Sequence, residues 1–160
     1  PQDSFATNVM HFTKTMINNI QYTINHINLN LLHNLMQDIK KANKVYLYAH
    51  GDARSLCYNM QRELQIYDIQ TIICDVDFNK DYLFFKNDLL IVLSTNGYSF
   101  HYNKRIIKRI REANVDKWLM TCNKNITLCQ NQIVIPLLEE KYSEYIMKYI
   151  IDILLLELQN

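Results

Sequence analysis

Apolar residues near the start of the chain recur at steps of three and four positions, which is the spacing of one helix face. They are Phe5, Val9, Phe12, Met16 and Ile20. We therefore predict a first helix over about residues 4–22. A second run with the same spacing extends from Leu31 to Ile39, and Asn28 or Asn30 can cap it, so it predicts a second helix.

Beyond residue 44 the pattern changes to short runs of apolar and β-branched residues separated by longer segments. These runs predict strands, and they cover 45–49, 71–74, 89–93, 118–121 and 133–135. Helical spacing returns over about 54–67 and 101–113, in a short helical turn after residue 121, and in a last helix over about 138–158. Between the second and third runs the chain has an aromatic segment around residues 82–85. Parallel strands need crossover connections of about a dozen residues, so strands separated by helical segments predict βαβ units.

The predicted fold is therefore α/β, with three layers: a doubly wound five-stranded parallel sheet of order 2-1-3-4-5 and helices on both faces. Residues 1–43 supply extra N-terminal lead-in helices, and residues 44–160 supply the α/β core. A chain of 160 residues is the size of one domain and can bury a core without disulfides or metals. We expect residues 1–160 to form a single domain.

Charge and cysteine content exclude several classes of protein. Seventeen Lys and Arg against sixteen Asp and Glu give a formal net charge of +1, so no global field favours nucleic acid, membrane or acidic partners. The four cysteines are 17, 48 and 7 positions apart, which fits neither a zinc site nor a redox CxxC pair and predicts reduced core thiols. No signal-like segment and no apolar stretch of about 18 residues occurs. These features predict a cytoplasmic protein without a metal.

Glycine is scarce, and its two positions are informative. Average usage of about 7% would give about eleven glycines in this length, but the chain has two, Gly51 after the first predicted strand and Gly97 after the third. In the order 2-1-3-4-5 those strands are neighbours, and their carboxyl ends flank the switch point where such sheets bind ligands. Either glycine alone is also consistent with a plain strand-to-helix turn. Together they predict a ligand crevice.

The loop after the third predicted strand has the composition of an anion site. It reads Ser94-Thr95-Asn96-Gly97-Tyr98-Ser99. Hydroxyls, an amide and backbone N–H groups at a helix N-terminus make a neutral cradle that suits a phosphate. Hydroxyl-rich caps also occur at helices that bind nothing. The loop lacks the Lys of a GxxxxGK[ST] motif, so it is not a nucleotide P-loop.

These two loops resemble the signatures of the SIS (sugar isomerase) domain, a G-x-G-x-S turn after the first strand and an S-x-S-G-x-[ST] phosphate loop after the third. The second signature matches at Ser94, Gly97 and Ser99, and the first matches at Gly51. The chain departs from the signatures by having Ala49, Ala53 and Asn96 at positions where the family has Gly, Ser and Ser.

Further similarity points to one subfamily, the RpiR/MurR bacterial transcription regulators. Asp52 is common there, and the segments 39–48 and 143–154 are similar to its lead-in turn and closing helix. The resemblance implies a flavodoxin-like SIS fold and a phosphosugar-binding, dimerising domain that controls carbohydrate metabolism and uses no cofactor. DNA would be contacted only through an N-terminal helix-turn-helix domain, and nothing before Phe5 is long enough to be that domain.

The resemblance also assigns candidate ligand contacts. The phosphate is expected on Ser94, Asn96, Gly97 and Ser99, and the sugar is expected toward His50, Gly51 and Asp52, with Glu140 as a further candidate. His101 is a second histidine in a crevice loop. SIS isomerases use a carboxylate near the last helix, and Glu140 or Glu144 could serve, although carboxylates also suit a helix N-terminus.

A sensor is favoured over an aldose-ketose isomerase, because binding needs only the phosphate cradle whereas isomerisation also needs a positioned base. No constellation of residues in the sequence demands such a base. The last helix is apolar on more than one face, and the first helix has an apolar stripe of its own. This surplus apolar surface predicts a homodimer.

Three other interpretations are weaker. The basic segment 104–111 resembles a nucleic-acid patch, but its isoleucines fit the buried face of a crossover helix whose cations are solvated. Asp75 and Asp77 follow the second predicted strand, where a dinucleotide fold places its ribose-binding acid, but the first turn lacks GxGxxG. A phospho-acceptor receiver domain fails because the third strand ends at Ser94 rather than at an Asp.

Overall fold

The computed structural model describes residues 2–97, 100 and 103–159. Its centre is a sheet of five parallel strands in the order β2-β1-β3-β4-β5, as predicted. The strands are β1 Val45–Ala49, β2 Thr71–Ile73, β3 Leu89–Ser94, β4 Asp116–Thr121 and β5 Asn131–Val134. In the register of β1 and β3, Ala49 pairs with Leu93, so the loops that contain the two glycines leave the sheet at the same edge.

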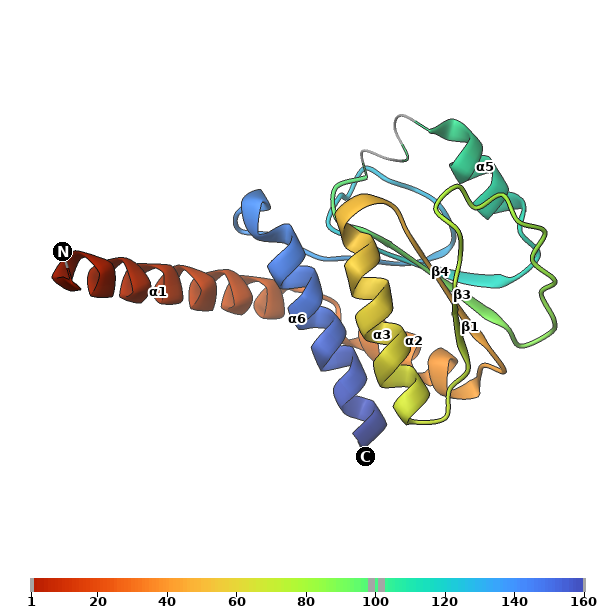
Figure 1. The fold of residues 1–160 in the computed structure, drawn as a ribbon, viewed down its shortest axis with the longest axis horizontal. Helices are drawn as coiled ribbons and strands as arrows, with labels where there is room; N and C mark the ends of the chain where they lie inside the picture. Colours follow the sequence, from red (N-terminus) through yellow and green to blue (C-terminus); the bar gives the residue numbers. More distant parts are fainter. Residues whose placement is uncertain (1, 98–99, 101–102, 160) are drawn as a thin grey trace.

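Helices cover both faces of the sheet, but unequally. One face is covered by α2 (Leu29–Lys41), α3 (Arg54–Ile66) and α6 (Ser143–Leu156), whose apolar residues form one core cluster with alternate strand residues. The other face is covered by α5 (Lys104–Glu112), which lies across the sheet from them (Figure 1). The remaining elements are α1 (Gln2–His26) and the short 3-10 helices η1 (Gly51–Ala53), η2 (Glu140–Tyr142) and η3 (Glu157–Gln159).

Of the connections without a regular helix, the first agrees with the aromatic segment seen in the sequence and the second differs from its prediction. The connection from β2 to β3 contains no helix and instead packs aromatic rings on the sheet, including Phe78 against Tyr48 and Phe84 against Tyr46. The short helical turn expected after residue 121 is an irregular loop. Aromatic rings bury a large surface, so they can cover the sheet without a regular helix. The spacing of apolar residues does not reveal how such rings pack.

Element boundaries also differ from the predicted ones. The first helix extends to His26, β5 ends at Val134, and α6 begins at Ser143 rather than near residue 138. Ile135 still donates its N–H to the carbonyl of Thr121 at 2.7 Å, but Pro136 has no N–H and cannot continue the ladder. The segment after Pro136 therefore runs across the sheet edge before the last helix starts.

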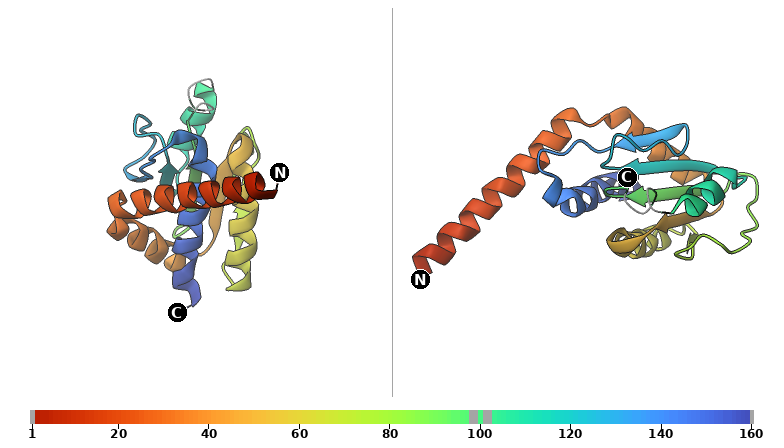
Figure 2. Two further views of the ribbon diagram at one scale, coloured as in Figure 1. Left: turned by 90° about the vertical axis from the view of Figure 1, so that its left-hand side faces the viewer. Right: turned by 90° about the horizontal axis from the view of Figure 1, so that it is seen from above.

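The first helix leaves the body of the molecule. Figures 1 and 2 show its N-terminal half projecting away from the sheet and from the helices that cover it. Its C-terminal half is anchored through buried Asn19 and Thr23, with buried Ile27 directly after the helix, and the Thr23 hydroxyl donates to the carbonyl of Pro136 at 2.6 Å. The projecting half leaves Phe5 71% exposed and Met10 62% exposed. None of the described helices is both long and apolar enough to cross a membrane.

Candidate functional site

The loop after β3 is held against the loop after β4. Gly97 has φ +80°, a left-handed conformation that favours glycine, and a Cβ added there would lie 1.9 Å from Cδ1 of Ile126. The amide of Asn123 donates to the carbonyl of Asn96 at 2.8 Å, and the N–H of Cys122 lies 3.2 Å from the carbonyl oxygen of Thr95. Glycine is thus needed at residue 97 both for its conformation and for the close approach of the two loops.

A cavity of about 560 Å³ opens beside this contact, at the carboxyl ends of β3, β4 and β5. Small-molecule sites usually occupy about 300–1,000 Å³, so it has the size for a sugar phosphate. Its wall comes from the β3 and β4 loops, the segment after β5, the start of α6 and α1. The lining residues are Tyr22, Thr95, Asn96, Cys122, Asn123, Lys124, Asn125, Val134, Ile135, Pro136, Leu137, Glu140 and Ser143.

The wall is mostly neutral and mixes polar with apolar side chains, with one charge of each sign. Lys124 comes from the β4 loop and Glu140 from η2. A lysine can hold an anionic group, and a carboxylate can accept sugar hydroxyls or serve as a base. Burial raises the pKa of the Cys122 thiol to about 12, so this cysteine is a neutral part of the wall rather than a nucleophile.

The predicted contacts divide into two groups around the β3 loop. Asn96 and Glu140 line the cavity. Ser94 is half-buried at the end of β3 and is not among the lining residues. Gly97 borders a neighbouring depression of about 620 Å³ against α5. Ser99 and His101 lie outside the described residues.

The other three predicted contacts follow β1 and do not line the cavity. His50, Gly51 and Asp52 are exposed there, and Gly51 has φ +67° with open space around the position of a Cβ. Nearby, Arg54 donates from Nη1 to the carbonyls of Ala49 at 3.0 Å and Cys74 at 3.1 Å, which caps the ends of β1 and β2. These residues form a flank of the β3 loop opposite to the cavity.

Sequence reasoning missed much of the cavity wall. Asn123, Lys124 and Asn125 follow the fourth strand as an unbroken polar run, and that run was the signal available. Tyr22 reaches the cavity from α1, more than seventy positions earlier in the chain than Asn96, and nothing in its own surroundings indicated this. Only the packing of α1 on the segment after β5 brings Tyr22 to the site.

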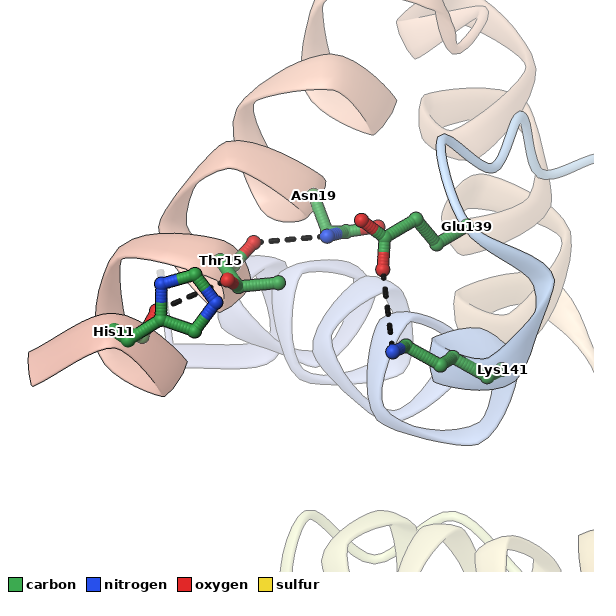
Figure 3. A network of polar contacts seen from close by, with 5 residues as sticks. All are labelled: His11, Thr15, Asn19, Glu139 and Lys141. Carbon is green, nitrogen blue, oxygen red and sulfur yellow. Dashed lines mark hydrogen bonds and ion pairs between the residues drawn. The ribbon is translucent and has the colours of Figure 1, made fainter. Parts of the chain in front are cut away.

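A polar seam joins α1 to the segment before η2. Figure 3 shows Glu139 pointing toward Asn19, next to its ion pair with Lys141 at 3.9 Å. Along α1, Asn19 donates to the carbonyl of Thr15 at 2.8 Å, and the Thr15 hydroxyl donates to the carbonyl of His11 at 2.9 Å. The rim of the cavity near Glu140 is thus in contact with the base of the projecting helix.

The weaker interpretations find structural roles for their residues. Burial opposes ionisation of Asp75, but hydrogen bonds from the Tyr82 hydroxyl and from the N–H groups of Asn79 and Lys80 lower its pKa, so it closes the aromatic loop. In α5, Ile106 is buried and Arg109 donates to the carbonyl of Asp77 at 3.0 Å. Among the described residues, no three His, Cys, Asp or Glu side chains gather as metal ligands would.

Comparison with protein families decides the classification, because the family model of the SIS domain matches residues 38–155. The chain belongs to the SIS domain family. The matched segment starts in α2 and ends in α6, so it covers the sheet and the cavity. No curated protein matches the chain.

Solved structures of SIS domains share the fold at low sequence identity. The NanR protein of Vibrio vulnificus complexed with ManNAc-6P has a TM-score of 0.71 and 14% identity. The match covers 98% of this chain but only 65% of the NanR chain. The sugar isomerase domain of an RpiR transcription factor from Sphaerobacter thermophilus has a TM-score of 0.68 and 16% identity, covering 94% of this chain and 88% of that chain.

A candidate sugar-phosphate isomerase from Listeria monocytogenes has a TM-score of 0.78 and 11% identity, covering 99% of this chain and 90% of that chain. At such identities the likeness shows the fold alone. The same fold is thus found both in a transcription factor and in a candidate isomerase, so the fold does not decide between the two roles.

Proposed function

We propose that this SIS domain binds a phosphosugar at the β3 loop and is the sensing and dimerising part of a cytoplasmic transcription regulator of carbohydrate metabolism. The observation that carries the proposal is the cavity of about 560 Å³ beside a loop of hydroxyl, amide and backbone N–H groups. A neutral cradle of this kind suits a phosphate at the start of a helix.

The phosphate is placed on Ser94, Asn96, Gly97 and Ser99. The sugar lies between two flanks, with His50, Gly51 and Asp52 on the β1 side and Glu140 on the β5 side. Lys124 adds a positive charge at the rim of the cavity. These assignments use each predicted contact once and need no metal or cofactor.

The regulatory part of the proposal draws on relatives and on α1. The RpiR structure is described as a transcription factor, and the NanR structure holds ManNAc-6P. The projecting half of α1 carries an apolar stripe that a second copy of the chain would cover. DNA would be reached through a domain outside residues 1–160.

Substitution of Ser94 tests the ligand site. Loss of one hydrogen bond to a charged phosphate costs about 1.5–3 kcal/mol, so Ser94→Ala is expected to weaken ManNAc-6P binding by roughly ten- to a hundredfold in calorimetry. Thr13→Ala is the control, since Thr13 is exposed on the projecting half of α1 and lines neither the cavity nor the depression beside Gly97. Equal affinities for wild type and Ser94→Ala would place the ligand elsewhere.

A sugar-phosphate isomerase is the second candidate, and the position of Glu140 favours it. Its carboxylate lines the cavity, where it could move a proton between the carbons of a bound sugar. As a sensor, the wild-type protein is expected to interconvert no hexose or pentose phosphates in a coupled assay. Turnover that Glu140→Gln abolishes would reverse the order of the two candidates.

A further inference from the structure

The side chain of Asn123 joins the β4 loop to the β3 loop in a fixed orientation. Its Nδ2 donates to the carbonyl of Asn96 at 2.8 Å, and its Oδ1 accepts from the N–H of Asn125 at 2.9 Å. Its backbone N–H donates to the hydroxyl of buried Thr121 at 3.0 Å. A flipped amide would place a donor against the Asn125 N–H and an acceptor against the Asn96 carbonyl, so only one orientation is favourable.

The two loops also pack without slack. The position of a Cβ on Gly97 lies 3.2 Å from Nδ2 of Asn123 and 1.9 Å from Cδ1 of Ile126. The backbone at Gly97 therefore cannot move toward the β4 loop, and the hydrogen bond from Asn123 keeps it from moving away.

This hydrogen bond sets the direction of one backbone N–H. The described chain has no cis peptide bond, and in a planar trans peptide the carbonyl and the following N–H point in opposite directions. The Asn96 carbonyl faces the β4 loop, so the Gly97 N–H points away from that loop. Because β3 lies between β4 and β1, this N–H points toward the β1 side of the β3 loop. Within the described part of the chain, no acceptor bonds to this N–H.

We infer that Asn123 is a positioning residue for the anionic group of the ligand. By holding the peptide between residues 96 and 97, it presents the Gly97 N–H to a phosphate oxygen before the ligand arrives. The inference rests on the proposed phosphosugar site and adds a residue that the loop signature does not contain. A preorganised donor avoids the free-energy cost of reorienting the peptide on binding, and the affinity for the ligand is higher by that amount.

Glycine labelling makes the N–H directly observable. The chain has two glycines, so protein labelled with nitrogen-15 glycine gives two backbone amide signals, and Gly51→Ala identifies the signal of Gly51. Inorganic phosphate and ManNAc-6P are the probes. In wild type the Gly97 proton signal is expected to move downfield as either probe is added, as it does when an N–H donates to an anion.

Two substitutions remove the donor. Asn123→Asp keeps the size and the acceptor of the side chain, and Asn123→Ala adds no charge. Both are expected to lose the downfield shift of Gly97 and to bind ManNAc-6P at least about tenfold more weakly. Asn131→Asp, which makes the same change at an exposed position at the start of β5, is expected to behave as wild type.

The outcomes separate this inference from the function on which it rests. Wild type that binds the probes without moving the Gly97 signal, or an Asn123→Ala variant that keeps both shift and affinity, overturns the positioning role alone. A variant whose melting temperature falls while the Gly97 response persists shows a merely structural residue and also overturns it. Wild type that binds neither probe overturns both proposals.

Discussion

Gly97→Ala is expected to be strongly destabilising and to remove phosphosugar binding. A side chain in the left-handed region costs about 1–2 kcal/mol, and overpacking typically costs a further 1–3 kcal/mol. Both apply, since Gly97 has φ +80° and its Cβ would lie 1.9 Å from Ile126. We expect the free energy of unfolding in urea to fall by about 2–5 kcal/mol and calorimetry to detect no ManNAc-6P binding at millimolar ligand.

The second glycine supplies the control for the stability measurement. Gly51 also has a positive φ, +67°, but a Cβ there meets nothing within 4 Å, so Gly51→Ala should cost only the conformational part. Adding Ile126→Ala to Gly97→Ala should recover part of the loss, with a coupling energy of about 1–3 kcal/mol. If the two glycine variants were equally stable, steric contact between the β3 and β4 loops would not be what requires glycine at residue 97.

Placing charges on the apolar stripe of α1 is expected to convert a dimer to a monomer. Phe5 and Val9 are four positions apart, so they share one side of the projecting half of α1, and they are 71% and 47% exposed. Burial of each such side chain contributes about 1.5–3 kcal/mol, and a twofold interface uses each residue twice. The variant carrying Phe5→Glu and Val9→Glu should therefore show about half the mass of wild type in light scattering at micromolar concentration.

Charges on the other side of the same helix provide the comparison. Lys14→Glu combined with Asn18→Glu alters exposed positions away from the stripe and should leave the mass unchanged. Circular dichroism would establish that α1 stays helical in both variants. A wild-type protein that ran as a monomer of 19.1 kDa would contradict the proposed homodimer directly.

The sheet was predictable because its strands are short apolar runs and because glycine marks the turns after two of them. The order of the strands and the placement of Gly51 and Gly97 at one edge agree with the structure. The aromatic character of the connection from β2 to β3 was visible in the sequence, but the packing of its rings was not, because they have no regular period. Tyr82 is held there by a 2.6 Å hydrogen bond to Asp75, a contact that depends on the folded loop.

The residues of the candidate site could be predicted where they lie in one loop. They could not be predicted where several segments of the chain come together. Residues of the β3 loop stand together in the sequence, and Asn96 does line the cavity. The partnership of Asn123 with the Asn96 carbonyl joins residues 27 positions apart, and its importance comes from a backbone direction. Side-chain patterns do not encode such directions, so only the structure can suggest the role.

The base of α1 lies at the rim of the cavity, and the rest of the helix projects from there as a long arm. Tyr22 lines the cavity, and Thr23 bonds to Pro136 in its wall, while the helix runs on to Gln2. At 1.5 Å per residue the arm beyond Tyr22 is about 30 Å long, so a tilt of about 5° at the pivot swings its tip by about 2–3 Å. A tilt of α1 about its contacts with the cavity wall would therefore be magnified at the N-terminal end of the helix.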